Sequence, residues 1–320
     1  MLTRRFFLSS AAAASAAAVL PASAFAKAPL MGASPAMVMR YKIGGMDLSA
    51  IADGGVTFPK PWEIFGEDQN PVAVRQLAAA QNLPIDKQTI TFTPCVVNTG
   101  NELVLFDTGW GSGNPGRGLM SDSLKAAGYT LDQIDVVVLT HYHPDHMGGL
   151  MDGDKPVFPN ARYVFPEADH NYWTNAKQDA GATKDFYALT KAKVVPLAEK
   201  ASFIKNGGEV VKGITALSTP GHTPGHTSYH LESEGQRLLI TGDICNHFVL
   251  SLQRPKWHVN FDMDKETATK TRLQTLDMVC TDRLPVMAFH FPFPCVGFIH
   301  KERSAEPSYY WHTAAYAFNG

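Results

Sequence analysis

Several short apolar segments of this chain each lead into a residue of a type that binds metal ions. The segments and their end residues are 136–139 with His141, 238–240 with Asp243, 286–289 with His290, and 214–217, which leads through a loop of Pro and Gly to His226. Short apolar runs of this kind are typical of buried strands. Side chains at the ends of neighbouring buried strands meet at one edge of a sheet. The pattern therefore predicts a sheet-based fold whose edge carries a site with several ligands.

Strand-like and helix-like segments are interspersed along the chain, which predicts an α/β arrangement of packed layers. Helices are expected over residues 71–82, 119–128 and 265–280, with strands over 135–140 and 162–165. Residues 89–97 and 102–107 flank an Asn/Gly turn and predict a hairpin. Residues 27–59 are expected to form an arm with one short strand at 47–52.

Composition limits the class of protein. The chain has 320 residues, of which 45% are hydrophobic and 18% charged, and its formal net charge is −2. This composition supplies a sizeable core and excludes a disordered chain. The nearly neutral balance argues against binding to nucleic acid or to anionic lipid. Since no run of 18 apolar residues follows the N-terminus, no membrane span is expected in the mature protein.

Residues 1–26 have the layout of an export signal. Arg4 and Arg5 precede a short Ala-rich apolar stretch, which ends at Ala24-Phe25-Ala26, a cleavage site of small residues. The Arg pair resembles a twin-arginine signal, which predicts a periplasmic or secreted protein. An N-terminal membrane anchor is the alternative, and the weak hydrophobicity of the stretch argues against it. Residues 27–320 are then expected to form a single domain.

The four cysteines do not form a disulfide framework. Cys95, Cys245, Cys280 and Cys295 are few for the length of the chain and show no paired spacing. An exported protein has access to oxidising conditions. The sequence therefore leaves room for one disulfide, whose partners it does not identify.

The densest chemical motif is His141-Tyr142-His143-Pro144-Asp145-His146, which contains three imidazoles and one carboxylate. Neutral imidazole and carboxylate are good ligands for a divalent ion such as zinc. A turn that follows a strand can direct some of these side chains to one ion and the others to a second. The motif therefore predicts a metal centre.

The ordered set of motifs resembles the metallo-β-lactamase-fold hydrolase superfamily. The set comprises the cluster at 141–146, Gly221-His222-Thr223-Pro224-Gly225-His226, Leu239-Ile240-Thr241-Gly242-Asp243 and His290. Residues 153–160, 226–229 and 290–294 are similar to the branch that contains methyl parathion hydrolase and related lactonases. The resemblance implies a four-layer αββα sandwich with the metals in a cleft between its two sheets.

The resemblance also implies two divalent metal ions, most simply zinc. His141, His143 and His226 would hold the first ion, Asp145, His146 and His290 the second, and Asp243 would bridge both. His222 is assigned a role in supporting its loop. Asp107 is expected to organise a loop or to orient a ligand imidazole, and Tyr142 is expected to point away from the metals.

Two such ions would activate a bridging hydroxide for hydrolysis. Asp145 is the candidate catalytic residue that handles the proton. The expected substrate is a small neutral ester: a lactone, such as an N-acyl homoserine lactone, or an aryl phosphotriester. Candidate pocket residues are the aromatic side chains Trp110, Trp173, Tyr172, Phe186, Trp257, Phe291 and Phe293.

Other functions stay open. A β-lactamase or a thioester hydrolase similar to glyoxalase II is the enzymatic alternative, although no Lys/Arg cluster near His290 would bind a glutathione carboxylate. A metal-binding redox protein or a binding module of the same fold is the non-enzymatic alternative. Residues 27–59 and the tail Tyr309-Tyr310-Trp311 are candidate contacts of a homodimer, or else they cover the core of their own protomer.

Overall fold

The computed structural model describes residues 37–314. These residues belong to one compact unit. Within the described range, every helix is too short or too polar to cross a lipid bilayer. The predicted export signal at residues 1–26 lies outside the described residues and stays a prediction, and so do the export route and the homodimer.

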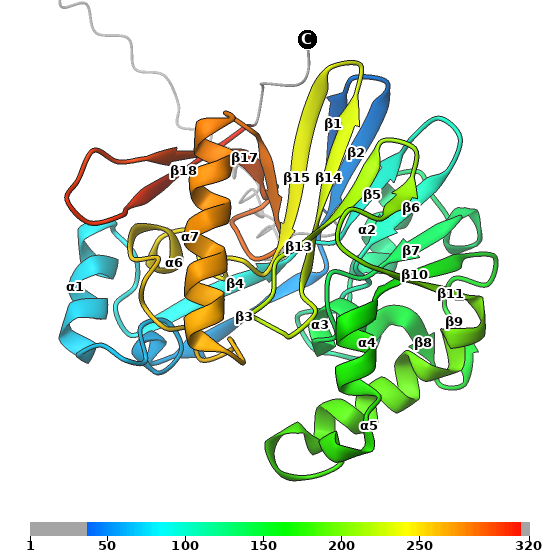
Figure 1. Cartoon of the computed structure of the whole chain (residues 1–320), viewed down its shortest axis with the longest axis horizontal. Helices are drawn as coiled ribbons and strands as arrows, with labels where there is room; N and C mark the ends of the chain where they lie inside the picture. Colours follow the sequence, from blue (N-terminus) through cyan, green and yellow to red (C-terminus); the bar gives the residue numbers. More distant parts are fainter. Residues whose placement is uncertain (1–36, 315–320) are drawn as a thin grey trace, which may run out of the picture. The chain divides into compact units, whose positions relative to one another are not determined.

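Two sheets of seven strands form the centre of the unit (Figure 1). The first sheet, in spatial order, contains β1 (Val38–Ile43), β2 (Met46–Ile51), β5 (Cys95–Asn98), β6 (Leu103–Phe106), β7 (Val136–Val138), β10 (Arg162–Pro166) and β11 (Ala201–Ile204). The second contains β12 (Glu209–Val211), β13 (Ile214–Ser218), β14 (Thr227–Ser233), β15 (Gln236–Gly242), β16 (Val286–Ala288), β17 (Val296–Lys301) and β18 (Tyr309–Thr313).

Shorter elements surround these sheets. Two small two-stranded sheets pair β3 (Gly54–Pro59) with β4 (Lys87–Phe92) and β8 (Met151–Asp152) with β9 (Lys155–Pro156). The α-helices are α1 (Pro71–Ala80), α2 (Met120–Ala126), α3 (Pro144–Met147), α4 (Glu167–Trp173), α5 (Lys184–Lys193), α6 (Leu250–Gln253) and α7 (Lys265–Thr281). The 3₁₀ helices are Pro61–Glu63, Leu131–Gln133, Gly148–Leu150, Ala176–Gln178, Gly181–Thr183 and Val195–Lys200.

The main core lies between the two sheets. Leu48 and Phe106 of the first sheet and Leu231 and Ile240 of the second are buried in one cluster of apolar side chains. Strand β7 shows how the first sheet serves two cores. Val136 and Val138 belong to the cluster between the sheets, whereas Val137 belongs to a second cluster on the other face. A strand that is covered on both faces is apolar at every position.

Helices cover the outer faces of both sheets. Leu124 of α2 and Trp173 of α4 pack with the second cluster, on the first sheet, and α7 packs against β17 of the second sheet. The predicted four-layer αββα sandwich is therefore confirmed. A third apolar cluster joins the β3–β4 sheet to α1 and α6 and includes Phe92 and Phe289.

The predicted helices at 71–82, 119–128 and 265–280 correspond to α1, α2 and α7. Their ends follow ordinary capping chemistry. The Asn70 side chain accepts a hydrogen bond from the Val72 amide, and Pro71 occupies the first turn, where no donor is needed. The Asp264 side chain accepts from the amide of Thr267 at the start of α7.

Three predictions about strands are wrong. The segment expected to be an arm with one strand holds β1, β2 and β3. The run at 89–97 is two strands, since Pro94, which has no amide hydrogen, separates β4 from β5, and only β5 pairs with β6. The apolar segments do not end at one sheet edge either, because β7 lies in the first sheet and β13, β15 and β16 lie in the second.

The sequence left two points open, namely a disulfide among the cysteines and the role of the tail residues. All four cysteines are free in the structure, so no disulfide forms among them. Tyr309 of β18 is fully buried in the core between the sheets, and β18 pairs with β17. The tail residues therefore complete the sheet of their own protomer.

Candidate metal centre

The candidate site lies where the two sheets meet at one end of the sandwich. The loop after β7 supplies His141, His143, Asp145 and His146, the loop between β13 and β14 supplies His222, and the segments after β15 and β16 supply Asp243 and His290. Helix α3 begins at Pro144, whose missing amide hydrogen suits the first turn. This short helix turns Asp145 and His146 toward the same centre.

The side chains form two groups with metal-binding potential. In the first group, His141, His143, His222 and Asp243 offer ligand atoms that all lie within 4.8 Å of one another. Asp145, His146 and His290 form the second group by the same measure.

Asp243 contacts both groups. Its Oδ1 lies 3.2 Å from His146 Nε2, and its Oδ2 lies 2.9 Å from His290 Nε2 and 3.2 Å from His222 Nε2. The two groups are therefore adjacent, with one carboxylate between them.

The structure corrects the prediction for His226, which lies outside both groups. Its Nε2 accepts a hydrogen bond of 2.9 Å from the Asp243 amide, and its Nδ1 lies 2.8 Å from Thr219 Oγ1. Both ring nitrogens are used in positioning protein groups. His222, which the sequence pattern assigned to loop support, takes the place of His226 in the first group.

Glycines make this arrangement possible. Gly242 has a φ of 54°, and a Cβ there would lie 2.6 Å from His226 Nε2. Gly221 has a φ of 127°, and a Cβ there would collide with the backbone of Ala268 in α7. The residues before Asp243 and His222 are thus required to be glycine by both conformation and space.

Buried polar atoms that make no hydrogen bond indicate that the residues suit a metal. His141 Nε2, His146 Nε2 and Asp243 Oδ1 are buried and make no hydrogen bond. Such atoms are rare in folded proteins because leaving them unpaired is costly. All three point into the two groups, and a set of imidazole and carboxylate ligands matches the preferences of zinc. The donor set therefore fits divalent metal ions.

Burial keeps two imidazoles of the first group neutral, whereas in His222 hydrogen bonds with Asp243 and Asp262 outweigh burial and raise the pKa to about 9. Burial and the neighbouring His146 and His143 lower the pKa of His141 well below its ordinary value. Burial and His222 lower the pKa of His143 to about 3. Both imidazoles are therefore neutral near pH 7, and neutral imidazole is the form that binds metal.

The carboxylates are held in their charged form. Burial alone would raise the pKa of Asp243, but His290 and His146 outweigh this and hold it well below the ordinary range. Burial and His146 act on Asp145 in the same opposed way, and its pKa is lowered. The centre therefore presents ionised carboxylates at neutral pH.

Neighbouring groups fix the rings of two ligand candidates. Asp107, which has a φ of 57°, accepts from the Thr140 amide at 2.8 Å, and its Oδ2 lies 2.8 Å from His146 Nδ1. His290 Nδ1 lies 2.9 Å from the Thr91 carbonyl oxygen. In both rings Nε2 is the atom left for the centre. The predicted role of Asp107 agrees with this geometry.

The structure also shows a supporting carboxylate that the sequence did not indicate. Asp169 of α4 is buried and accepts hydrogen bonds from the Tyr142 amide, from Thr223 Oγ1 and from the Gly225 amide. It therefore joins the loop that holds His141 and His143 to the loop that holds His222. Tyr142 itself is fully buried on the outer side of the first sheet, away from the centre, as predicted.

A cavity of about 640 Å³ opens over the two groups. Trp110, Trp173 and Phe186 line it, as predicted, whereas Tyr172, Trp257, Phe291 and Phe293 do not. Its lining also includes apolar side chains that sequence reasoning missed, namely Phe58, Ile90, Phe92, Phe261 and Met263. These come from β3, β4 and the loop before α7, whose packing beside the site depends on long-range contacts.

Known proteins resemble this chain in sequence. The pattern of the metallo-beta-lactamase superfamily matches residues 94–277. An atrochrysone carboxyl ACP thioesterase of Passalora fulva is 33% identical over 149 residues, which are 46% of this chain and 36% of that protein. An uncharacterized protein of Bacillus subtilis, YobT, is 32% identical over 110 residues, 33% of this chain and 44% of its own length. The chain thus matches less than half of each of these relatives.

Solved structures resemble the whole fold. AidC, described as a dizinc quorum-quenching lactonase, superposes with a TM-score of 0.80 at 23% identity, covering 87% of this chain and 97% of its own. The hydrolase AbOPH superposes with a TM-score of 0.80 at 25% identity, covering 88% and 98%. The family match spans more than half of the chain and the fold agrees with it, so this chain belongs to the metallo-beta-lactamase superfamily.

Proposed function

We propose that this chain is a metal-dependent hydrolase that opens lactones and cleaves related neutral esters. The observation that supports this most is the pair of adjacent His/Asp groups, which share Asp243 at the base of an apolar cavity. A site of this kind combines ligands for metal ions with a place for a small organic substrate. The structural neighbour AidC is described as a dizinc lactonase, and AbOPH as a hydrolase.

In this proposal the two groups hold two divalent ions, most simply zinc. His141, His143 and His222 would bind one ion, Asp145, His146 and His290 the other, and Asp243 would contact both. When bound, such ions supply an activated water at neutral pH and stabilise negative charge on the substrate oxygen. With His222 in place of His226, the ligand types follow one another along the chain in the order that the resemblance to the superfamily implies.

Asp145 is the proposed proton acceptor. It lines the cavity, and its Oδ2 lies 3.5 Å from His146 Nε2 and 3.4 Å from His290 Nε2. Because its lowered pKa keeps it ionised at neutral pH, it can accept a proton from the attacking water and pass it to the leaving oxygen.

The cavity favours a neutral substrate with an apolar portion. Aromatic side chains from two sides form its walls, and neither Lys nor Arg occurs among the described residues that line it. An anionic substrate would therefore meet the carboxylates of the centre without a cationic partner. A lactone that carries an acyl chain, or an aryl phosphotriester, meets this requirement.

Thioester hydrolysis is the second candidate, because two of the curated relatives are named as ACP thioesterases. A thioester also needs an activated water and charge stabilisation at a carbonyl oxygen. The two candidates differ in the group that leaves, an alkoxide in one and a thiolate in the other.

A hydrolysis panel on the metal-loaded protein tests the proposal. The panel contains acyl homoserine lactones of several chain lengths, an aryl phosphotriester, an aryl ester, a β-lactam and a thioester. We expect the highest kcat/KM for a lactone or phosphotriester, and loss of turnover after chelation. Faster turnover of the β-lactam or thioester would contradict the substrate class, and hydrolysis that survives complete chelation would contradict the role of metals.

A further inference from the structure

Arg272 in the middle of α7 is a fully buried cation that lies outside the proposed ligand set. Its Nε donates to the Ile244 carbonyl at 2.9 Å, and its Nη1 donates to the carbonyls of Pro255 and Trp257 at 2.9 and 3.3 Å. Its Nη2 donates to Asp262 Oδ2 at 2.6 Å. The guanidinium therefore holds Ile244, which follows Asp243, and residues 255–257, which precede the residues of the cavity wall.

Asp262 connects this cation to the metal centre. Its carboxylate is buried, with Oδ2 on Arg272 and Oδ1 2.9 Å from His222 Nδ1. The other nitrogen of the same ring, Nε2, lies 3.2 Å from Asp243 Oδ2, inside the first group. A series of contacts, from guanidinium to carboxylate to imidazole, thus leads from α7 to the proposed metal position.

The chemistry of the ring explains what this contact does. An ionised carboxylate only accepts hydrogen bonds, so it requires the hydrogen of His222 to reside on Nδ1. In the neutral ring, Nε2 then carries the lone pair that can bind a cation, and this atom lies inside the first group, 2.9 Å from His143 Nδ1. The negative charge behind the ring also makes Nε2 a stronger donor to a cation.

The two groups share this design. In the second group Asp107 contacts His146 Nδ1, and in the first group Asp262 contacts His222 Nδ1. His141 instead has the hydroxyl of Thr140 near Nδ1, at 3.0 Å, and His290 has a backbone carbonyl. Each group therefore contains one imidazole with a carboxylate behind it.

Backbone contacts tie Asp262 to the same loop. The amide of Met263 donates to the His222 carbonyl at 3.1 Å, and the amide of Asp264 donates to the Gly221 carbonyl at 3.0 Å. Phe261 and Met263, on either side of Asp262, line the cavity. The wall of the cavity and the His222 loop therefore hold each other in place.

We propose that Asp262, held by Arg272, is a positioning residue that fixes the tautomer and orientation of His222 for metal binding. This rests on the proposed function only in taking His222 as a ligand. The test therefore measures metal binding, which does not depend on the identity of the substrate.

The first variant is Asp262→Asn in the full chain, stripped of metal and titrated with Co²⁺ against a competing chelator. The side-chain amide of asparagine has only one oxygen that accepts hydrogen bonds, so it cannot replace both carboxylate oxygens, which accept from His222 and Arg272. The His222 ring therefore loses its fixed tautomer. We expect Co²⁺ affinity at one of two sites to weaken by about 10–100-fold, with a changed visible Co²⁺ spectrum. The control is Asp277→Asn on the exposed side of α7, which contacts Lys301 and Tyr309 and should leave Co²⁺ binding unchanged.

Arg272→Lys separates positioning from general stability. The lysine keeps a cation near Asp262 but loses the contacts with Ile244, Pro255 and Trp257. We expect a lower thermal midpoint than in Asp262→Asn, with a smaller loss of Co²⁺ affinity. If Asp262→Asn does not fold, the double variant Asp262→Asn/Arg272→Met removes the unpaired buried cation, and we expect the same weakened site.

Two results would overturn the proposal. One is a folded Asp262 variant, single or double, that binds Co²⁺ with the affinity and spectrum of the unmodified chain. The other is a loss of affinity that merely follows the loss of thermal stability across the Asp262 and Arg272 variants. If the hydrolysis panel gives no turnover while Asp262→Asn weakens Co²⁺ binding as expected, the proposed function fails and the positioning role stands.

Discussion

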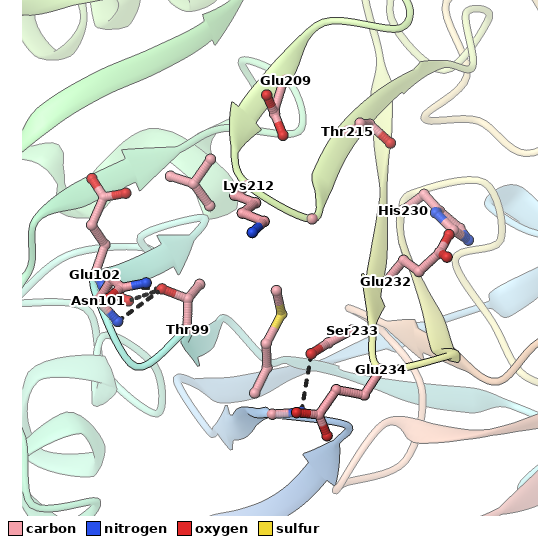
Figure 2. A pocket seen from close by; sticks show the side chains of 14 residues that line it. Thr99, Asn101, Glu102, Glu209, Lys212, Thr215, His230, Glu232, Ser233 and Glu234 are labelled. Carbon is pink, nitrogen blue, oxygen red and sulfur yellow. Dashed lines mark hydrogen bonds between the residues drawn. The ribbon is translucent and has the colours of Figure 1, made fainter.

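The two ends of strands β14 and β15 carry cavities of similar size with very different chemistry. At the metal end, about 640 Å³ lies over buried His and Asp side chains. At the turn end, about 710 Å³ lies among residues that include Glu209, Lys212, His230 and Glu232. Figure 2 shows these side chains around an open centre, with Glu209 and Lys212 from β12 and the turn that follows it, and His230 and Glu232 from β14.

The two ends differ in how deeply their charged and polar side chains are buried and in how closely these side chains approach one another. At the turn end, Glu209, Lys212 and Glu232 are exposed, and Glu102 pairs with Arg162 at 3.1 Å near the surface. At the metal end, three buried ligand atoms make no hydrogen bond, although they lie close to other members of the two groups. Water can solvate the charged groups at the turn end, whereas the buried groups at the metal end are shielded from water and suit a bound metal ion. Cavity volume alone is therefore a poor guide to function here.

The largest expected effect is the loss of the carboxylate shared by the two groups. In Asp243→Ala, kcat/KM for the best substrate of the panel should fall by at least about 10³-fold, since the proposed metals would supply several kcal/mol of charge stabilisation. Glu232→Ala at the turn end should change kcat/KM by less than about twofold. Steady-state kinetics with metal analysis checks both, and comparable losses in the two variants would break the contrast between the ends.

The next effect concerns the support of the ligand loops. Asp169→Ala leaves the Tyr142 and Gly225 amides and the Thr223 hydroxyl without their buried acceptor, so unfolding free energy should drop by about 3 kcal/mol. The control, Glu102→Ala, removes an exposed ion pair and should cost less than about 1 kcal/mol. Denaturant unfolding measures both values. Equal values would show that burial does not distinguish these carboxylates.

Asp53 provides a pH-dependent test. It is buried, its carboxylate accepts from the amides of Trp110 and Met120, and burial raises its pKa from 3.8 to about 6. The folded chain thus binds this proton more tightly than the unfolded chain. The resulting stabilisation is complete below about pH 4 and is lost as the pH rises through about 6.

Asp53→Asn should remove this pH dependence. Between pH 4 and pH 7 the stability of the unmodified chain should fall by up to about 3 kcal/mol relative to that of the variant. Unfolding curves at several pH values measure the difference. A difference that stays constant with pH would show that Asp53 is not the group that titrates.

The smallest expected effect concerns substrate choice. Phe186→Ala removes an aromatic wall of the cavity, so KM for a long-chain lactone should rise by about tenfold, while KM for a short-chain lactone should change little. Phe203→Ala, on β11 and outside the cavity lining, is the matched control. A parallel rise of KM for both chain lengths would place the acyl chain elsewhere.

Local motifs made much of the centre predictable. His141, His143, Asp145 and His146 lie within six residues, so one loop brings them together whatever surrounds it. The roles of His222 and His226 were not predictable from residue type, since both stand in the same loop after a glycine. What separates them is distant in sequence: the Asp243 amide takes His226, and Asp262 takes His222.

Long-range packing explains the other errors. Apolar runs show that strands are buried, but they do not say which sheet each strand joins. The sequence therefore does not distinguish the meeting of two sheet edges from a single edge. Arg272 and Asp169 occur in ordinary helical segments, where nothing in the local pattern marks a buried charge. Their roles depend on partners brought together only by the complete fold.

The proposed ligands are spread between residues 141 and 290 and come from both sheets. This spread has a consequence for the folding of the chain. A chain that lacks β16 has no His290, and a chain whose sheets have not yet stacked has no complete group. Cations that bind only the complete groups would link the two sheets and shift the folding equilibrium toward the packed sandwich. Metal uptake would then be a late event, which follows the packing of the two sheets.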